Sequence, residues 1–332
     1  MAVTTKAPAE ARGVMTPEHF QKRFDAIVGN IEHVVKGKTD VIRMVLVAVL
    51  AEGHVLLEDL PGTGKTMLAR SLAQTIDAPS NRVQCTPDLL PSDVTGSPVL
   101  DLKTQAFNFR PGPVFASVLL VDEINRATPK TQSALLEAMQ ERNVTVDGVT
   151  HPLPEPFIML ATENPVELAG TFPLPEAQLD RFLFKLSLGY PARDAERDVI
   201  RANRAQDAIL RLGSITDREE ILDMVTWAKG VEVSDEIVNY IIDLCQATRT
   251  DPSLMIGAST RASLALTKAA AVVAASRGRE DVYPDDVQSV VNAVFAHRIV
   301  LAPDALLRDE TVEKVIERVL ARVKPPLGAA KN

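Results

Sequence analysis

Apolar positions along the chain switch between helical spacing and short continuous runs. From Pro17 to Glu52 they recur three and four positions apart, which predicts two helices with a break at residues 36–38. Three short apolar runs follow, at 55–57, 118–121 and 157–161. Each run fits one strand that is covered on both faces, and helical spacing returns between them. Strands that alternate with helices predict an α/β fold with a parallel sheet.

Two alternating stretches predict β-hairpins set between the strands and helices. Residues 98–109 alternate between polar and apolar around Lys103-Thr104. Residues 143–151 alternate around Asp147-Gly148, and an Asp-Gly pair is a strong signal for a tight hairpin turn. We therefore expect two β-hairpin inserts in the α/β part of the chain.

Beyond residue 191 the chain shows helical spacing and no strand pattern. The predicted helices span 194–205, 217–229, 234–248, 260–277, 284–297 and 310–322. Ser234 suits an N-terminal cap, and Pro284 suits the first turn of a helix. The sequence thus predicts a flexible N-terminal tail at 1–15, an αβα domain at 16–190 and a small all-helical domain at 191–332.

Composition and charge narrow the classes of partner. The net charge is −8 and no basic run dominates, which disfavours nucleic acid as a partner. The apolar runs fall short of the roughly 18 residues that a membrane span needs, and the N-terminus lacks the apolar core of a signal peptide. Cys85 and Cys245 have no metal-type spacing and are interpreted as reduced thiols. We expect a cytoplasmic protein.

The first chemistry-bearing motif lies between an apolar run and a helix-favouring run. Residues 60–66 read Leu-Pro-Gly-Thr-Gly-Lys-Thr, the pattern of a loop whose backbone N–H groups face phosphates at a helix N-terminus. Lys65 is expected to reach the β- and γ-phosphates, and the Thr66 hydroxyl to ligate Mg²⁺. The full set expected to bind a nucleotide here is Gly62, Thr63, Gly64, Lys65, Thr66 and Met67.

This motif departs from the usual spacing at one position. The first glycine of the common pattern, five positions before Gly64, is Asp59 here. Pro61-Gly62 can still form the tight turn, because glycine accepts positive φ and proline presets its own. The earlier break at Gly37 would lie near the adenine of a bound nucleotide, or would be an ordinary turn between helices.

A second motif ends the apolar run at 118–121. Asp122 and Glu123 follow it directly, at the carboxyl end of a predicted parallel strand, where α/β sheets bind ligands. We expect Asp122 to hold Mg²⁺ through water. Glu123 would orient and deprotonate the attacking water. The two motifs together predict ATP and Mg²⁺ as cofactors.

Three further stretches resemble one known group, the AAA+ ATPases, and within it the MoxR family. They are Gln84 to Asp93, Asp122 to Ala127 continued through Leu136 to Glu141, and Ala161 to Pro165 continued to Leu179-Asp180-Arg181-Phe182. The likeness spans about residues 16 to 325. The phosphate loop with Asp59 also looks like that of MoxR proteins. The resemblance implies an AAA+ P-loop domain of αβα type with the two hairpins as inserts, followed by a helical lid.

The resemblance also implies roles for three residues. Asn164 matches sensor 1, which helps to place the attacking water. Arg181 matches the arginine finger, which reaches the γ-phosphate bound by a neighbouring subunit. Arg261 matches sensor 2, which contacts the nucleotide of its own subunit. With Lys65 and Glu123, these three residues make up the expected catalytic set.

A finger that acts on a neighbour implies a ring, and AAA+ proteins commonly form hexamers. MoxR proteins look like chaperone-type ATPases that work with von Willebrand factor A domain proteins on a client protein. The sequence thus predicts an ATP-hydrolysing ring with remodelling or maturation activity. Three alternatives stay open: a DNA motor or loader, a small-molecule P-loop kinase, and an ATP-binding regulatory switch with low turnover. The charge of −8 argues against the first, and Glu123 with Asn164 argues against the second.

Overall fold

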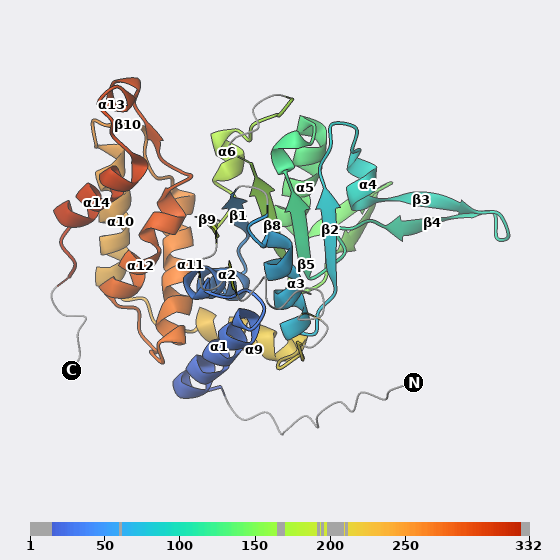
Figure 1. The fold of residues 1–332 in the computed structure, drawn as a ribbon, viewed down its shortest axis with the longest axis horizontal. Helices are drawn as coiled ribbons and strands as arrows, with labels where there is room; N and C mark the ends of the chain where they lie inside the picture. The colour runs from blue at the N-terminus through green and yellow to red at the C-terminus, as the bar shows by residue number, and fades with distance from the viewer. Residues whose placement is uncertain are drawn as a thin grey trace.

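The computed structural model describes residues 15–59, 62–164, 170–190 and 212–326, with the isolated positions 193, 196, 197 and 209. Its centre is a parallel five-stranded sheet (Figure 1). In spatial order the strands are β2 (Ser80–Gln84), β5 (Val118–Asp122), β8 (Ile158–Glu163), β1 (Val55–Glu58) and β9 (Phe184–Leu186). Every neighbouring pair is parallel, as the sequence pattern predicts.

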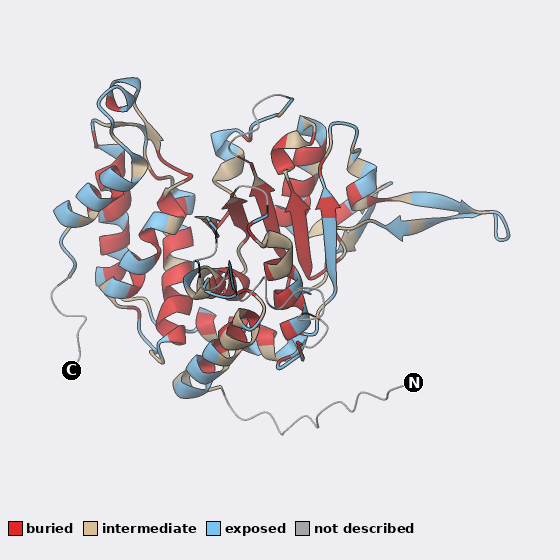
Figure 2. Ribbon diagram, viewed as in Figure 1, coloured by how far each residue is buried: buried red, intermediate tan, exposed pale blue. Residues whose placement is uncertain are grey.

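Alternate residues of the central strands face two separate cores, because successive side chains of a strand point to opposite faces. Val118 and Leu120 belong to one buried cluster, whereas Leu119 and Val121 belong to the other. Both faces are therefore covered, and Figure 2 shows the central strands buried between helices. The predicted αβα layering is confirmed.

Helices cover the two faces unequally. On the first face lie α1 (Pro17–Glu32), α2 (Thr39–Leu50) and α3 (Lys65–Thr75), and on the second lies α5 (Pro129–Glu141). The Thr16 hydroxyl caps α1 by accepting a hydrogen bond from the His19 N–H at 3.2 Å. Three short turns of helix complete this part: α4 (Pro91–Thr95), η1 (Ile124–Arg126) and α6 (Glu176–Leu179).

Both predicted hairpins are present. The first pairs β3 (Gly96–Asp101) with β4 (Ala106–Pro111) and projects far from the body of the protein in Figure 1. The second pairs β6 (Asn143–Val146) with β7 (Val149–Pro152) around the Asp147-Gly148 turn. The Phe109 ring of the first stacks on the His151 ring of the second, with centroids 4.0 Å apart. The two inserts thus touch one another.

The remainder of the described chain is mainly helical. Its helices are α9 (Arg218–Lys229), α10 (Asp235–Arg249), α11 (Thr260–Ser276), α12 (Pro284–Phe295), α13 (Pro303–Leu306) and α14 (Val312–Arg322). The expectation of no strand here is wrong, because β10 (Leu254–Ile256) pairs antiparallel with β11 (Val300–Leu301). Strands of three and two residues are too short to leave an alternating pattern.

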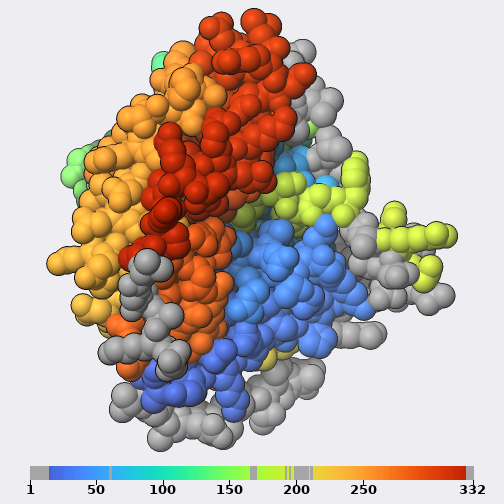
Figure 3. Space-filling model, turned by 90° about the vertical axis from the view of Figure 1, so that its left-hand side faces the viewer, coloured from blue at the N-terminus to red at the C-terminus, as the bar shows by residue number. Residues whose placement is uncertain are grey.

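Some predictions fall on residues outside the described ranges. These are the tail at 1–15, apart from Met15, and the helix at 194–205, apart from two isolated positions. The division at residues 190 and 191 stays a prediction. Within the described residues, α9 and α11 lie against α1 and α2 in one continuous core. Figure 3 shows the orange surface of the later helices directly beside the blue surface of α1 and α2.

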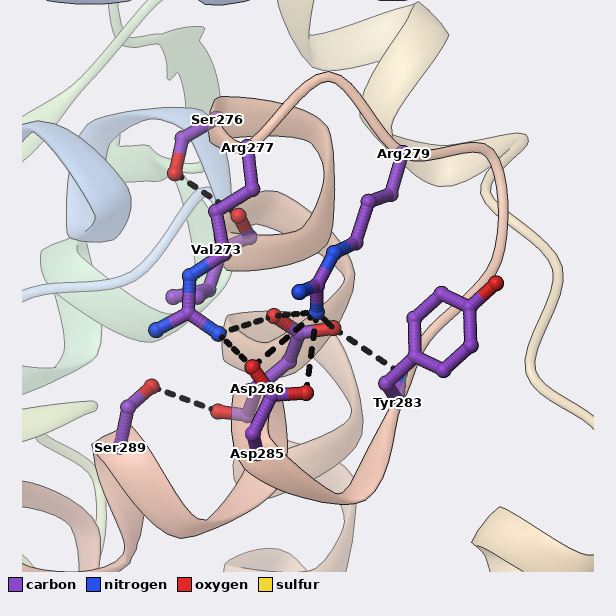
Figure 4. Close-up of polar contacts among 8 residues, drawn as sticks. All are labelled: Val273, Ser276, Arg277, Arg279, Tyr283, Asp285, Asp286 and Ser289. Atoms are coloured by element: carbon purple, nitrogen blue, oxygen red, sulfur yellow. Dashed lines mark hydrogen bonds and ion pairs between the residues drawn. The ribbon is translucent and has the colours of Figure 1, made fainter. Parts of the chain in front are cut away.

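An ion-pair network links the residues that follow α11 to the first turn of α12 (Figure 4). Asp286 is fully buried there, and its carboxylate accepts hydrogen bonds from Arg277 and Arg279 at 2.5 and 3.0 Å. It also accepts the Tyr283 N–H at 2.9 Å. Asp285 pairs with the same two arginines at 2.7 and 2.9 Å, but its side chain is 56% exposed.

We expect the buried member of this network to dominate its contribution to stability. Asp286→Ala should lower the free energy of unfolding by about 2–3 kcal/mol, because both arginines and the Tyr283 N–H lose a buried acceptor. Asp285→Ala is the matched control and should cost less than about 1 kcal/mol, since solvent screens the exposed pair. Urea unfolding of both variants measures the difference. Equal losses would show that burial does not set the strength of this network.

Candidate functional site

A pocket of about 340 Å³ opens at the carboxyl ends of the central strands, beside the N-terminus of α3. This is the edge where parallel α/β sheets bind ligands. The pocket brings together most of the predicted site. Its lining residues are Asp59, Gly62, Thr63, Gly64, Lys65, Thr66, Met67, Arg82, Gln84, Asp122, Glu123, Thr162, Glu163 and Asn164.

The phosphate loop has the backbone that its sequence predicts. Gly62 and Gly64 both adopt the left-handed region, with φ of 85° and 97°. A residue with a side chain would be strained there, so the loop requires glycine at these two positions. Gly64 also caps α3, whose first N–H groups face the pocket opening and favour an anion. The Lys65 ammonium group donates to the Asp59 carbonyl at 3.1 Å.

The two acids at the end of β5 are held by neighbouring side chains. The buried Asp122 carboxylate accepts from Arg82 Nε at 2.7 Å and from the Thr162 hydroxyl at 3.3 Å. Glu123 has a φ of 56°, and its N–H donates to the same Thr162 hydroxyl at 2.9 Å. Its carboxylate accepts from Gln84 Nε2 at 3.1 Å and pairs with an arginine of η1. Each acid thus has a fixed position at the pocket.

Sequence reasoning missed Arg82, Gln84 and Thr162 as site residues. Arg82 and Gln84 lie two positions apart on one face of β2, and the parallel register places Gln84 beside Asp122. The alternation is visible in the sequence, but the pairing of β2 with β5 is not. Thr162 directly follows the apolar run at 157–161, two residues before Asn164 at the same edge, and no motif in the sequence marks it as a site residue.

Thr162 offers a direct test of how the acids are positioned. We expect Thr162→Val to lower kcat for ATP hydrolysis about tenfold, because the Glu123 N–H and the Asp122 carboxylate lose a common partner without a change in side-chain shape. Steady-state kinetics and the dissociation constant for ADP measure the effect. The matched control is Thr145→Val in the exposed hairpin, which removes a hydroxyl contact to Thr150 far from the pocket. An unchanged kcat in Thr162→Val would contradict the positioning role.

The oxygen ligands present suit Mg²⁺. The described residues contain no group of three or more His, Cys, Asp and Glu side chains that could hold a metal alone. Mg²⁺ usually takes one or two protein oxygens together with phosphate oxygens and water. The Thr66 hydroxyl and the Asp122 carboxylate meet that need, since both line the pocket.

Cys85 lies next to this site as a buried free thiol. Burial, with Asp122 and Glu123 nearby, raises the pKa of its thiol to about 12. A thiol with that pKa is protonated at neutral pH and is a poor nucleophile. Cys245 is also a buried free thiol, and burial raises its pKa.

The structure places three predicted site residues outside the pocket. Gly37, with a φ of 69°, lies in the turn between α1 and α2 and does not line it. Arg261 lies in the first turn of α11, 53% exposed, with its guanidinium 3.9 Å from the Asp180 carboxylate. Arg181 follows α6, and its Nε is buried with no hydrogen-bond partner among the described residues. The roles expected for these residues stay predictions.

A buried arginine fixes the backbone around Arg181. Arg298, in the turn between α12 and β11, donates from Nε to the Asp180 carboxylate at 2.8 Å and from Nη1 to the Leu183 carbonyl at 3.0 Å. Burial lowers the pKa of Arg298 to about 10, with Asp180 opposing the shift, so the guanidinium stays charged at neutral pH. The Ser259 hydroxyl, just before α11, donates to the same Asp180 carboxylate at 3.0 Å. These contacts tie the Arg181 segment to two later helices.

Comparisons with known proteins agree with this geometry. A model of the ATPase family associated with various cellular activities (AAA) matches residues 54–184, and a model of the AAA lid domain matches residues 246–319. Chaperone MoxR1 of Mycobacterium tuberculosis is 40% identical over 96% of this chain and 86% of its own length. Protein MoxR of Paracoccus denitrificans is 32% identical over 92% of this chain and 97% of its own. The chain belongs to the MoxR family of AAA+ ATPases.

Two further relatives support the family and its fold. Protein YeaC of Bacillus subtilis is 47% identical over 90% of this chain and 94% of its own length. The crystal structure of a candidate ATPase from Cytophaga hutchinsonii superposes with a TM-score of 0.88 at 36% identity, over 94% of this chain and 97% of that one. As a MoxR-family protein, the chain has the nucleotide-binding fold of an AAA+ ATPase. Within the described residues, none of the helices has the length and hydropathy of a membrane span.

Proposed function

We propose that this MoxR-family protein binds ATP with Mg²⁺ in the pocket at the end of the sheet and hydrolyses it. The observation that carries the proposal is the meeting of Lys65 and Thr66 with Asp122, Glu123 and Asn164 around one cavity. These residues come from three separate stretches of the chain. Their side chains supply what phosphoryl transfer to water needs, namely phosphate contacts, a metal ligand set and a group that orients water.

Each residue then has a role that its position supports. Lys65 exchanges its contact with the Asp59 carbonyl for the β- and γ-phosphates. Thr66 and Asp122 would hold Mg²⁺, Asp122 through water, and the metal would supply charge neutralisation at the phosphates. Glu123 orients the attacking water and accepts its proton. Asn164, 8% exposed at the end of β8, helps to place that water.

We further propose that hydrolysis occurs at sites shared between neighbouring subunits of a ring, with a hexamer as the expected assembly. Arg181 does not line the pocket of its own chain, and its buried Nε lacks a partner among the described residues. A position outside the pocket of its own chain is compatible with a role at the pocket of a neighbouring subunit. Arg181 then stabilises charge on the γ-phosphate of the adjacent site. Arg261, which does not line the pocket in this structure, is proposed to contact the nucleotide of its own subunit.

We propose that the free energy of ATP hydrolysis drives chaperone-like remodelling or maturation of a client protein. One relative carries the name chaperone, which supports this class of activity. A protein with a von Willebrand factor A domain is the proposed partner. The projecting β3–β4 hairpin offers an exposed surface for contacts, with Leu102 and Phe107 84% and 72% exposed.

ATP turnover with and without Mg²⁺, over a wide range of protein concentration, tests this proposal. We expect hydrolysis that needs Mg²⁺ and whose rate per subunit rises with protein concentration. A rate per subunit that stays flat would exclude shared sites and leave a self-contained nucleotide enzyme. Binding of ATP with no turnover at any concentration would favour a regulatory switch, and stimulation by DNA would favour a DNA motor.

A further inference from the structure

Asp59, the acidic residue at the start of the phosphate loop, forms hydrogen bonds to a segment far from the loop in the sequence. The Asp59 side chain is 5% exposed, and its carboxylate accepts three hydrogen bonds from consecutive residues after β9. The donors are the Ser187 hydroxyl at 3.0 Å, the Leu188 N–H at 2.6 Å and the Gly189 N–H at 2.9 Å. Three donors to one buried carboxylate form a strong, charge-assisted contact.

The backbone of Asp59 takes part in the nucleotide pocket at the same time. Its carbonyl accepts the Lys65 ammonium group at 3.1 Å, and its N–H donates to the Glu163 carbonyl at 3.2 Å. One residue therefore contacts the phosphate-binding lysine through its main chain and the segment 187–189 through its side chain.

The contacted segment leads out of the sheet toward the helical part of the chain. Gly189 has a φ of 61°, and the next residue, Tyr190, has its carbonyl held by the Lys38 ammonium group at 2.8 Å. Lys38 precedes α2, which packs against α9 and α11. In Figure 3 the yellow-green surface of this part of the chain borders the blue surface of α1 and α2. The segment 187–190 is thus a junction between the sheet and the helices that follow.

We propose that Asp59 is a positioning residue that couples the phosphate loop to the segment 187–190. The proposal rests on the function proposed above, since it requires that a nucleotide binds the loop. When phosphates take Lys65 and order the loop, Asp59 becomes more rigid and holds the Leu188 and Gly189 amides more tightly. The aspartate at the position of the usual first glycine is therefore a link to the helical part, and a glycine there would lack it.

Hydrogen exchange of the segment 187–190 tests this link, with ATPγS and Mg²⁺ as the probe. In the wild type, saturating ATPγS should slow exchange of these amides about threefold, because a ligand that binds the native loop stabilises what the loop contacts. In Asp59→Asn an amide nitrogen replaces one acceptor oxygen, so one of the two N–H groups loses its partner. Exchange in the free variant should then be about tenfold faster, and the response to ATPγS should disappear.

Two further variants sharpen the result. Asp59→Gly restores the common loop pattern and should also abolish the response of 187–190. Asp101→Asn is the matched control: that carboxylate accepts the Lys103 N–H at 2.8 Å in the distant hairpin, and its loss should leave exchange at 187–190 unchanged. A response to ATPγS that persists in both Asp59 variants would overturn the proposal, as would a wild type that binds ATPγS without any change at 187–190. If ATPγS does not bind the wild type, the proposed function itself fails and the coupling fails with it. The comparison of the free proteins still decides whether Asp59 holds the segment.

Discussion

Glu123→Gln is expected to lower kcat for ATP hydrolysis by about 10²–10⁴, the range that removal of a general base gives. The amide cannot accept the proton of the attacking water. It keeps the size of the side chain and can still accept the hydrogen bond from Gln84, which is 3.1 Å from the carboxylate in the native protein. The variant should therefore bind ATP with a dissociation constant within about threefold of the wild-type value, since this interaction acts in the transition state.

The matched control is Glu163→Gln, a carboxylate in the same pocket on the neighbouring strand. Burial raises the pKa of Glu163. We expect kcat to fall less than about fivefold in this variant, because it takes no part in proton transfer. Equal losses in both variants would mean that Glu123 is one of several pocket charges and not the group that activates water.

Arg181→Ala should reduce hydrolysis by a factor of at least about 10², because a finger that stabilises transition-state charge is worth about 10³–10⁵ where it has been measured. The affinity of the isolated chain for ATP should stay within about threefold, since Arg181 does not line its own pocket. The variant should therefore lose hydrolysis and keep its affinity for ATP. Turnover and equilibrium binding, measured on the same preparation, give both quantities.

Arg308→Ala serves as the control for Arg181, because it removes an exposed arginine whose Nε donates to the Asp304 carbonyl. Its kcat should match that of the wild type. A loss of ATP affinity in Arg181→Ala equal to the loss of rate would contradict a role on a neighbouring site. The position of Arg181 itself depends on Arg298 and Asp180, so the fold of each variant is checked by its unfolding curve.

Local patterns in the sequence were sufficient for the layers of the fold and for the phosphate loop. The runs at 55–57 and 118–121 mark buried strands, and the turn at Asp147-Gly148 marks a hairpin, because each signal lies within a few residues. The glycines at 62 and 64 follow from the loop spacing in the same way. Asp122 and Glu123 reach the pocket because strands of a parallel sheet end at one edge.

Contacts between distant parts of the chain could not be predicted in this way. Arg298 lies 118 positions after Asp180, and the pairing depends on how α12 packs beside the sheet. The Asp59 carboxylate meets a segment about 130 positions later, and no local pattern signals that contact. The contact of Arg82 with Asp122 could not be predicted either, because it depends on the pairing of β2 with β5. The site was thus predictable where motif spacing defines it, and not where packing of separate elements completes it.

The measurement that tests the central claim most directly mixes two inactive variants. Glu123→Gln lacks the water-activating acid but keeps Arg181, whereas Arg181→Ala keeps the acid but lacks the finger. If sites are shared within a ring, an equal mixture regains about a quarter of the wild-type rate, because one interface in four pairs an intact Glu123 with an intact Arg181. Each variant alone is the baseline, and sizing confirms that both assemble. A mixture that stays as inactive as its components, although mixed assemblies form, would show that Arg181 does not act on a neighbour's site.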